Sequence, residues 1–393
     1  MKPVLPVSLL QPKKKTRQKI KLPIQPGTPH TMSTWQDPFG SNRLGLWLAD
    51  RLDRKKNQIA RIAARWGWLK PMGERGKVVW VMAGAKKNSV RLAVELVRAI
   101  RQKRLDIRII LTFEHEYPDL LNLLDDCDKT GWGFAPCDHP RALSRAMQRL
   151  SPFGMILVDT EARPQLSKLL ARHEHVLLVN PPHAVNFNCE HIYNDPTQTA
   201  ASGADMQVIL VQAQIDPNFR SLINHGKERH LWWLHGAAAS VSAIFAQQLF
   251  EFDRDAVLFI SGASPAAAYL AISQWDRSPV SDGTIIWVDD EKWLPAISAA
   301  VTATHFVKID SVILWQAMAG GAAISCATAQ ELPRMTLSAA ITTSSNPFEI
   351  WRTYRTNAIL ARQQGDGARR LFWQERRLAE TESQALVTRV FEW

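Results

Sequence analysis

Cysteine is scarce in this sequence, and its spacing excludes the common metal and disulfide frameworks. The four cysteines are far apart, and none belongs to a C-x-x-C pair: Cys127, Cys137, Cys189 and Cys326. This pattern argues against a zinc site and favours a reducing compartment. No uncharged apolar run is long enough to cross a bilayer, so no transmembrane helix is expected. We expect neither a bound metal nor a cofactor.

Acidic residues are too few to balance the basic ones. The 393 residues carry a formal charge of +11 and a sequence pI of about 9.6. Such an excess points to nucleic acid, anionic lipid or phosphorylated substrates as partners. The fifteen tryptophans are dispersed and do not interleave with the basic runs, as RNA-stacking platforms would. Because RNA-binding and helix-turn-helix signatures are also missing, we expect no nucleic-acid partner.

Much of the positive charge lies near the N-terminus. Residues 1–40 are rich in Pro, Lys, Thr and Gln and predict a disordered basic arm. Residues 43–66 follow with apolar residues at helical spacing and with arginines and lysines over much of the remaining surface. A basic amphipathic helix of this kind suits the surface of an anionic membrane, and the same stripe suits packing on its own domain.

The rest of the chain alternates strands with helices, which predicts βαβ units and parallel sheets. The expected strands lie at 78–82, 107–112, 155–158, 176–179, 206–211, 256–260, 284–288 and 305–307, and a long last helix lies at 369–391. The composition shifts near 225–240, so we divide the chain into an N-terminal domain (41–228) and a shortened C-terminal domain (229–393). The predicted fold is α/β: two Rossmann-like doubly wound domains that face a cleft.

An acidic turn follows the best-defined strand. The segment PFGMILVDTEARPQLSKLL (152–170) has an apolar strand, then Asp159 and Glu161, then a proline at a helix start. Ligands of open parallel sheets bind outside the carboxyl ends of the strands, so both carboxylates are candidate catalytic groups. They also suit a plainer role as caps of the following helix.

A basic turn, GAKKNS, joins an earlier strand to its helix. Asn88 or Ser89 can cap that helix, and Lys86 and Lys87 add positive charge beside its free N–H groups. The turn lacks the spacing of a P-loop and of G-x-G-x-x-G. We therefore expect an anion site here, with Lys86, Lys87 and Ser89 as contacts, or a plain exposed turn.

A third turn stands late in the chain. Asp310 and Ser311 precede a helix that reads VILWQAMAGG. A helix N-terminus with a hydroxyl group, facing the cleft, is a natural phosphate site, and the same residues form an ordinary N-cap.

Together these segments resemble the Kdo (3-deoxy-D-manno-octulosonic acid) transferase family, which are GT-B glycosyltransferases of lipopolysaccharide assembly. The matching stretches are RWGWLKPMGERGKVVWVMAG (65–84), RIILT (108–112), FAPCDHPRALSRAM (134–147), ILVDTEARPQL (156–166), LLVN (177–180), VILVQAQIDPNFRSLINHG (208–226) and HFVKIDSVILWQAMAGG (305–321). The resemblance implies that Asp159 and Glu161 take the place of the family's paired glutamates. Thr112 and Asn180, which end two of the matched stretches, are further expected substrate contacts.

The sequence departs from the family at positions that matter for chemistry. The family's catalytic glutamate, taken as the base that deprotonates the acceptor hydroxyl, aligns with Asn88, and an amide cannot accept a proton. Gln316 stands where a glutamate that contacts the sugar nucleotide is expected, and the glycine-rich segment before it is missing. Arg163 and Gln165 replace an expected Trp and Asn.

The resemblance implies a glycosyltransferase that moves a sugar, most simply Kdo from CMP-Kdo, to an anionic glycolipid of the lipid A type. Such a protein would be peripheral, at the cytoplasmic face of the bacterial inner membrane. The lysines of the GAKKNS turn would hold an acceptor phosphate, the turn at Asp310 would face the nucleotide, and Asp159 or Glu161 would replace the missing base. The alternative is a catalytically inactive scaffold, or a sugar- or lipid-binding protein, of an envelope polysaccharide pathway that works beside a partner transferase. A nucleic-acid-binding protein is a third and weaker hypothesis.

Overall fold

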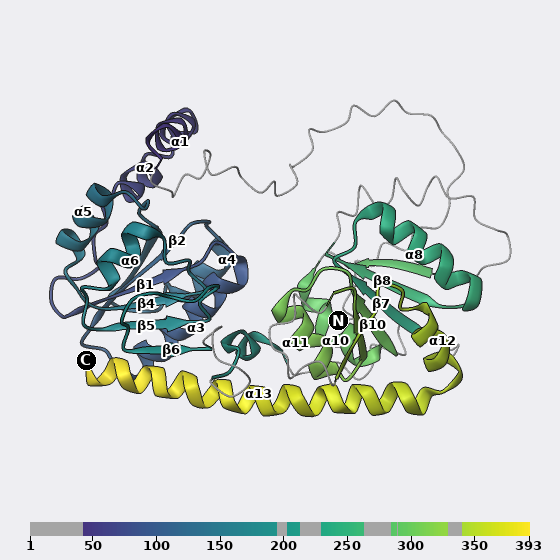
Figure 1. The fold of residues 1–393 in the computed structure, drawn as a ribbon. Coiled ribbons are helices and arrows are strands. Elements are labelled where there is room, and N and C mark those ends of the chain that lie inside the picture. Colours follow the sequence, from purple (N-terminus) through teal and green to yellow (C-terminus); the bar gives the residue numbers. More distant parts are fainter. Residues whose placement is uncertain (1–41, 195–202, 213–228, 263–283, 289, 329–339) are drawn as a thin grey trace, which may run out of the picture.

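Two six-stranded parallel sheets, each covered by helices, form the body of the molecule (Figure 1). The computed structural model describes residues 42–194, 203–212, 229–262, 284–288, 290–328 and 340–393. The arm expected at residues 1–40 lies outside the described residues. None of the described helices is long and apolar enough to span a membrane. The predicted α/β class is confirmed.

The first sheet has the strand order β3-β2-β1-β4-β5-β6, and all neighbouring strands are parallel. Its central strands are short apolar runs buried on both faces, as parallel strands between helical layers are. The strands are β1 (Val78–Ala83), β2 (Arg108–Phe113), β3 (Thr130–Phe134), β4 (Pro152–Val158), β5 (Val176–Val179) and β6 (His191–Tyr193). The helices are α1 (Arg43–Lys55), α2 (Ile59–Arg65), α3 (Lys87–Lys103), α4 (Pro118–Leu121), α5 (Pro140–Leu150) and α6 (Pro164–Leu170), with the 3₁₀ turns η1 (Asn122–Leu124) and η2 (Met206–Leu210).

The second sheet has the order β12-β11-β10-β7-β8-β9. If its strands are numbered from β7 as the first, this sheet has the same strand order as the first sheet. That order is the one found in Rossmann folds. Its strands are β7 (Leu231–His235), β8 (Val257–Ser261), β9 (Thr284–Val288), β10 (Ala303–Phe306), β11 (Ala323–Cys326) and β12 (Ile341–Thr343). Its helices are α8 (Ala239–Phe252), α10 (Leu294–Ala300), α11 (Ser311–Gly320), α12 (Phe348–Thr356) and α13 (Ala358–Glu392), with the 3₁₀ turn η3 (Glu291–Trp293).

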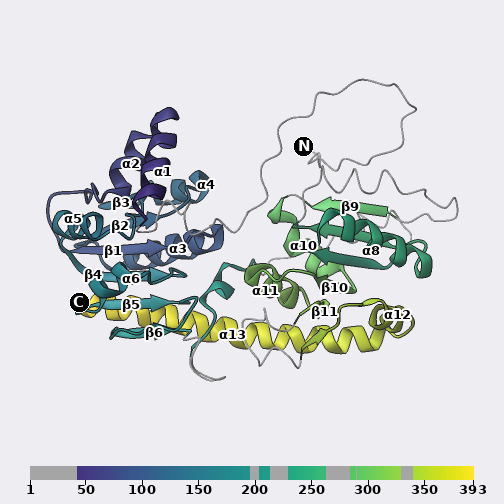
Figure 2. The same ribbon diagram turned by 45° about the horizontal axis from the view of Figure 1, so that its top comes forward.

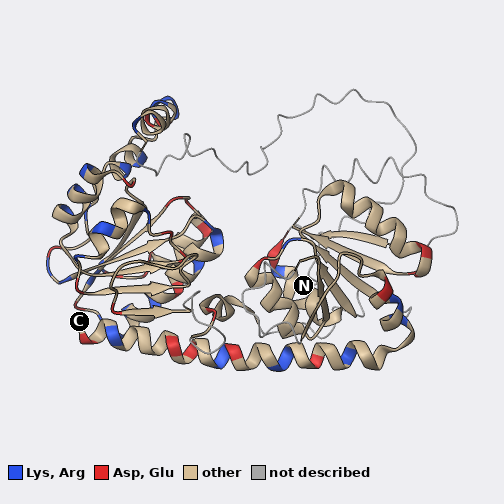
Figure 3. Cartoon of the chain, viewed as in Figure 1, with Lys and Arg blue, Asp and Glu red and all other residues tan. Residues whose placement is uncertain are grey.

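Several predicted elements differ from the structure. The helix expected over 43–66 is broken into α1 and α2, because Asn57 adopts a positive φ of 56° between them. Both pieces are rich in Lys and Arg (Figure 3). The strand expected at 206–211 is the 3₁₀ turn η2, which connects the two sheets. Sequence analysis also missed β7, whose LWWLH sequence is fully buried.

Helix α13 runs along both domains (Figures 1 and 2). Arg369 donates to the carbonyl oxygen of Gly320 in the second domain at 2.6 Å. Further along the helix, Glu375 accepts from the backbone N–H of Asp205, at the start of η2, at 2.8 Å. The sequence assigned this helix to the C-terminal domain, whereas its last turns lie against the N-terminal domain.

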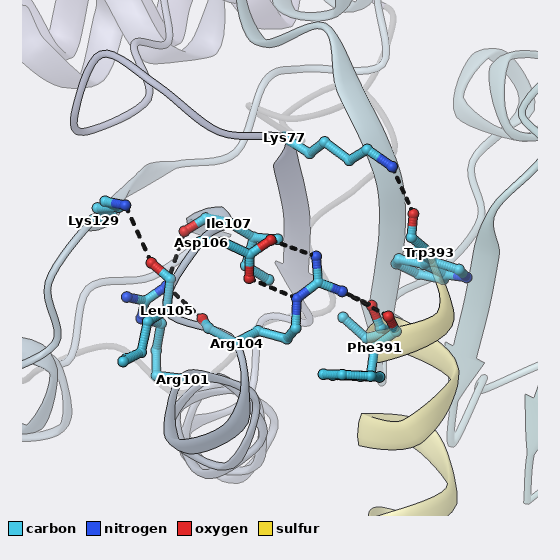
Figure 4. Close-up of polar contacts among 10 residues, drawn as sticks. Lys77, Arg101, Arg104, Leu105, Asp106, Ile107, Lys129, Phe391 and Trp393 are labelled. Carbon is cyan, nitrogen blue, oxygen red and sulfur yellow. Dashed lines mark hydrogen bonds and ion pairs between the residues drawn. The ribbon is translucent and has the colours of Figure 1, made fainter.

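Polar contacts hold the end of α13 on the first domain (Figure 4). Arg104 donates to the carbonyl oxygens of Val390 and Phe391 at 3.0 and 2.8 Å, which satisfies helix-end acceptors that have no partner inside the helix. Lys77 donates to the backbone oxygen of Trp393 at 2.7 Å. A Cβ at Gly154 would lie 2.2 Å from the Trp393 ring, so this close packing requires glycine. The helix therefore ties the two domains together.

Candidate functional site

The two sheets have equivalent switch points, where the strand order reverses. In the first sheet β1 and β4 are neighbours, and in the second β7 and β10 are neighbours. Ligands of doubly wound sheets bind outside the carboxyl ends of such strands. Asn88 and Asp159 follow β1 and β4, and His235 and Asp310 end or follow β7 and β10. Sequence-predicted residues from distant segments therefore lie at both switch points.

Asp159 lies in the first switch point with its backbone in the left-handed region, at a φ of 48°. Its Oδ2 accepts a hydrogen bond from Nε2 of Gln207 at 2.9 Å. Burial raises the pKa of the Asp159 carboxyl to about 6, although interactions with Gln207 and Ser89 oppose the rise. A Cβ at Gly84 would lie 2.2 Å from the Asp159 carbonyl oxygen, so only glycine lets the two turns approach. A carboxylate with this pKa can act as a general base near neutral pH.

The N-terminus of α3 faces the second domain. The helix starts at Lys87 with Lys86 as its N-cap, and no side chain accepts from its first N–H groups. The predicted cap by Asn88 or Ser89 is therefore wrong. Ser89 is buried toward Asp159, and Nδ2 of Asn88 donates to Oδ1 of Asp310 at 3.3 Å. The uncapped N–H groups favour an anion.

Two contacts join α3 to the second domain. Besides the hydrogen bond between Asn88 and Asp310, Nζ of Lys87 lies 3.3 Å from Oε2 of Glu291 in η3. Both side chains of this ion pair are about half exposed, so the pair adds little stability. Lys86 is exposed beside it. These contacts bring the two switch points face to face.

Asp310 is the N-cap of α11. Its Oδ1 accepts from the backbone N–H groups of Val312 and Ile313 at 3.0 and 3.2 Å. Its carboxylate therefore already occupies the helix end where the sequence suggested a phosphate, and this geometry is that of the alternative, an ordinary N-cap. Ser311, at the first position of α11, is half-buried beside it.

Asp205 is the buried centre of the connection between the domains. Its Oδ2 accepts from the indole Nε1 of Trp315 in α11 at 2.8 Å, and its Oδ1 accepts from Nδ2 of Asn180 at 3.2 Å. The Asp205 charge also contributes to the raised pKa of Asp159. Asn180, an expected substrate contact, is buried in this network after β5.

Comparison with known proteins gives a family for the first domain. Residues 60–181 match the family model of 3-deoxy-D-manno-octulosonic-acid transferase (kdotransferase). This segment is therefore similar to the Kdo transferase family. The resemblance inferred from sequence is thus confirmed over the part of the chain that holds β1 to β5. No curated protein matches the chain.

Solved structures share the whole fold. A glycosyltransferase from Rickettsia africae aligns with a TM-score of 0.54 at 9% identity, over 81% of this chain and 99% of that chain. MurG from Acinetobacter baumannii aligns with a TM-score of 0.52 at 11% identity, over 81% of this chain and 100% of that chain. The predicted GT-B fold is confirmed, and the Kdo transferase domain and this fold together support a glycosyltransferase.

Glu161 and Asp159 have different surroundings. Glu161 is exposed and lines a cavity of about 270 Å³ with Thr160, Ser167, Pro181, Pro182, His183 and Asn186, among others. Neither carboxylate caps α6: Asp138 accepts from the backbone N–H groups of Gln165 and Leu166 at 3.1 and 2.8 Å. The plain capping interpretation of the acidic turn is therefore wrong.

Two expected contacts lie in the protein interior. The hydroxyl of Thr112 is buried and accepts from the indole Nε1 of Trp80 at 2.9 Å. Gln316 is buried and its Nε2 donates to the backbone oxygen of Gln212 at 3.1 Å. Both side chains are buried and form hydrogen bonds inside the protein. The structure therefore does not present them as substrate contacts.

Sequence analysis missed two residues of the site. Gln207, the hydrogen-bond partner of Asp159, was assigned to a strand. His235 ends β7, and its Nδ1 lies 2.8 Å from the hydroxyl oxygen of Ser261. Burial lowers the pKa of His235 to about 4, and the Asp310 charge opposes this shift. The sequence signal that could have located His235 is an apolar run followed by His-Gly.

Among the described residues, no group of side chains could hold a metal ion.

Proposed function

We propose that the chain transfers a sugar from a nucleotide-activated donor to an envelope glycolipid. Kdo from CMP-Kdo is the simplest donor, and a lipid A-type molecule is the simplest acceptor in lipopolysaccharide biosynthesis. The observation that carries this proposal is Asp159, a carboxyl with a pKa near 6 at one switch point of a GT-B fold. The Kdo transferase domain and the glycosyltransferase fold support the reaction class.

In the proposed reaction, Asp159 accepts the proton of the acceptor hydroxyl as its oxygen attacks the anomeric carbon. The bond between that carbon and the phosphate oxygen breaks, and the nucleotide leaves with the electron pair. Lys86, Lys87 and the uncapped N-terminus of α3 would hold an anionic group of the acceptor beside the base. Asn88 cannot serve as the base, because an amide does not accept a proton.

Transfer is tested with the purified full chain, a panel of CMP-, UDP- and GDP-sugars, and a lipid A-type acceptor. Asp159→Asn is expected to lower the rate about 10²–10⁴-fold, the usual contribution of a general base. Glu116→Gln, a change of an exposed carboxylate in the loop after β2, is the matched control and should leave the rate unchanged. Wild-type activity should rise with pH through about 6, as Asp159 loses its proton. Full activity of Asp159→Asn would refute the assignment.

The second candidate is a catalytically inactive scaffold or sugar-binding relative. It is favoured by Asn88, which stands where the resemblance expects the base and is hydrogen-bonded to Asp310. Calorimetry with CMP, UDP and GDP separates the two proposals. Saturable binding of one nucleotide supports the transferase, whereas no nucleotide binding and no transfer support the scaffold.

We also propose that the protein is peripheral at the cytoplasmic face of the inner membrane, where such an acceptor would be reached. Fractionation of cells that express the full chain tests this location. Recovery with inner membranes, with release by high salt, is the expected result. Recovery only with the cytosol would contradict it.

A further inference from the structure

The outer surface of the α1–α2 pair is apolar, although both helices belong to a folded domain. Its large side chains are between 42% and 65% exposed: Leu44, Trp47, Leu48, Leu52, Ile59 and Trp68. On α1 these residues recur three and four positions apart, so they share one face, while Gly45, Leu46 and Asp53 turn inward. We call these six side chains the outer face. Large apolar side chains that are exposed together on one helix face are typical of an interaction site.

The exposed charges of α1 and α2 are positive, because Asp50 and Asp53 turn toward Arg65. Asp50 and Asp53 both bind the buried guanidinium of Arg65, the first at 2.5 Å, and Asp50 also accepts from Nε1 of Trp66 at 2.7 Å. Over the described residues from 42 to 73 no Asp or Glu is exposed, whereas the exposed cations are Arg43, Arg51, Arg54, Lys55, Lys56 and Lys70. Figure 3 shows this cationic end of the first domain, remote from α13.

Arginines extend the outer face onto α5. Arg145 and Arg149 lie 4.8 and 5.1 Å from the centre of the Trp68 ring, and Arg51 lies 5.4 Å from that of Trp47. Exposed tryptophans with adjacent arginines are typical of residues that sit at a membrane–water interface. A protein partner would need matching acidic residues at each position, whereas an anionic bilayer supplies negative charge over the whole area.

We propose that the outer face docks on an anionic lipid bilayer, with α1 in the plane of the interface. The apolar side chains enter the boundary between headgroups and acyl chains, and the surrounding arginines and lysines bind lipid phosphates. This inference deepens the proposed peripheral location. Docking requires no catalysis, so it can be tested independently of the proposed transfer reaction.

The test is co-sedimentation of the full chain with vesicles of phosphatidylglycerol and phosphatidylcholine in equal amounts, and with phosphatidylcholine alone. The wild type should bind the anionic vesicles and lose most binding at high salt. Trp47→Ser with Leu48→Ser should weaken binding at least tenfold. The matched control is Ile359→Ser, at an exposed isoleucine of α13, and it should bind as the wild type does.

Four results would overturn the inference. One is equal binding of the wild type to both vesicle types, and another is equal binding of the double variant and the wild type to anionic vesicles. The third is binding that the double variant retains but that disappears when residues 1–41 are removed, which would assign docking to that segment. The fourth is no vesicle binding together with a dimer that the double variant dissociates, which would make a second copy the occupant. Circular dichroism of each variant confirms that these surface substitutions leave the fold intact. If the protein binds vesicles but transfers no sugar, the proposed reaction is refuted and the docking inference is not.

Discussion

Replacing Asp159 by asparagine should stabilise the protein while removing its proposed base. A carboxyl with a pKa near 6 instead of 3.8 is less stable in its ionised form by about 3 kcal/mol, at about 1.4 kcal/mol per pH unit. Asparagine tolerates the left-handed backbone at this position and can still accept the hydrogen bond from Gln207. At pH 7 we therefore expect Asp159→Asn to raise the free energy of unfolding by about 3 kcal/mol.

The sign of the pH dependence follows from linkage. Because the folded-state pKa of Asp159 is higher than the unfolded value, the wild type loses stability from this group as pH rises from about 4 to about 6. The neutral variant does not. The difference between the two proteins should be near zero at pH 4, grow up to about pH 6, and stay constant above it.

Urea unfolding at a series of pH values, followed by circular dichroism, measures this difference. Glu116→Gln, an exposed control, should give no pH-dependent difference of this size. A variant that is less stable than the wild type at pH 7 would show that Gln207 and its neighbours stabilise the charged carboxylate. A difference that does not change with pH would lead to the same conclusion. Either result would remove the physical ground for a base that titrates near neutral pH.

Four further substitutions, two of them combined in one protein, test the contacts between the domains. Asn88→Glu removes a hydrogen bond and sets two carboxylates together, so it should cost about 1–2 kcal/mol in urea unfolding, and a second change, Asp310→Asn, should recover most of that loss. Asp205→Ala leaves the buried indole N–H of Trp315 without an acceptor and should cost about 3 kcal/mol, measured in the same way. Arg104→Ala frees the last carbonyls of α13, and hydrogen exchange of the final turn should become faster.

Two of these variants, Asn88→Glu and Arg104→Ala, have a control from the same region. Lys87→Ala removes an ion pair that is half exposed, so it should change stability by less than about 1 kcal/mol. Arg98→Ala removes an exposed pair with Glu95 on α3 and should leave exchange in α13 unaltered. Destabilisation by Lys87→Ala as large as that by Asn88→Glu would contradict our ranking of the two contacts. Unchanged exchange in Arg104→Ala would show that Lys77 and the packing of Trp393 are sufficient to hold the helix end.

The sequence predicts the fold well where strands are continuous apolar runs. The strands β1 and β4, and the helix α11 after Asp310, are found within a few residues of their expected positions. The prediction failed at 206–211, where an apolar run forms a 3₁₀ turn, because periodicity does not distinguish such short segments. It also missed β7, where the basic residues before LWWLH concealed a buried strand.

The candidate site is only partly readable from sequence. Carboxyl ends of strands are visible as apolar-to-polar transitions, and this signal located Asp159, Asn88 and Asp310. What the sequence cannot give is which side chains already have partners. Thr112 and Gln316 are satisfied inside the protein by groups about 32 and 104 positions away, and such long-range pairing has no local pattern.

The residues at the two switch points depend on one another electrostatically. Oδ1 of Asp310 caps α11 and also accepts a hydrogen bond from the side chain at position 88. A glutamate at 88 would be repelled by that carboxylate, whereas asparagine donates to it, so the amide and the cap are chemically matched. Under the proposed function, the base then follows the neighbouring strand, since β4 lies next to β1 and Asp159 comes directly after β4. Burial at that position raises the carboxyl pKa toward neutrality, which is the property that proton transfer from a sugar hydroxyl requires.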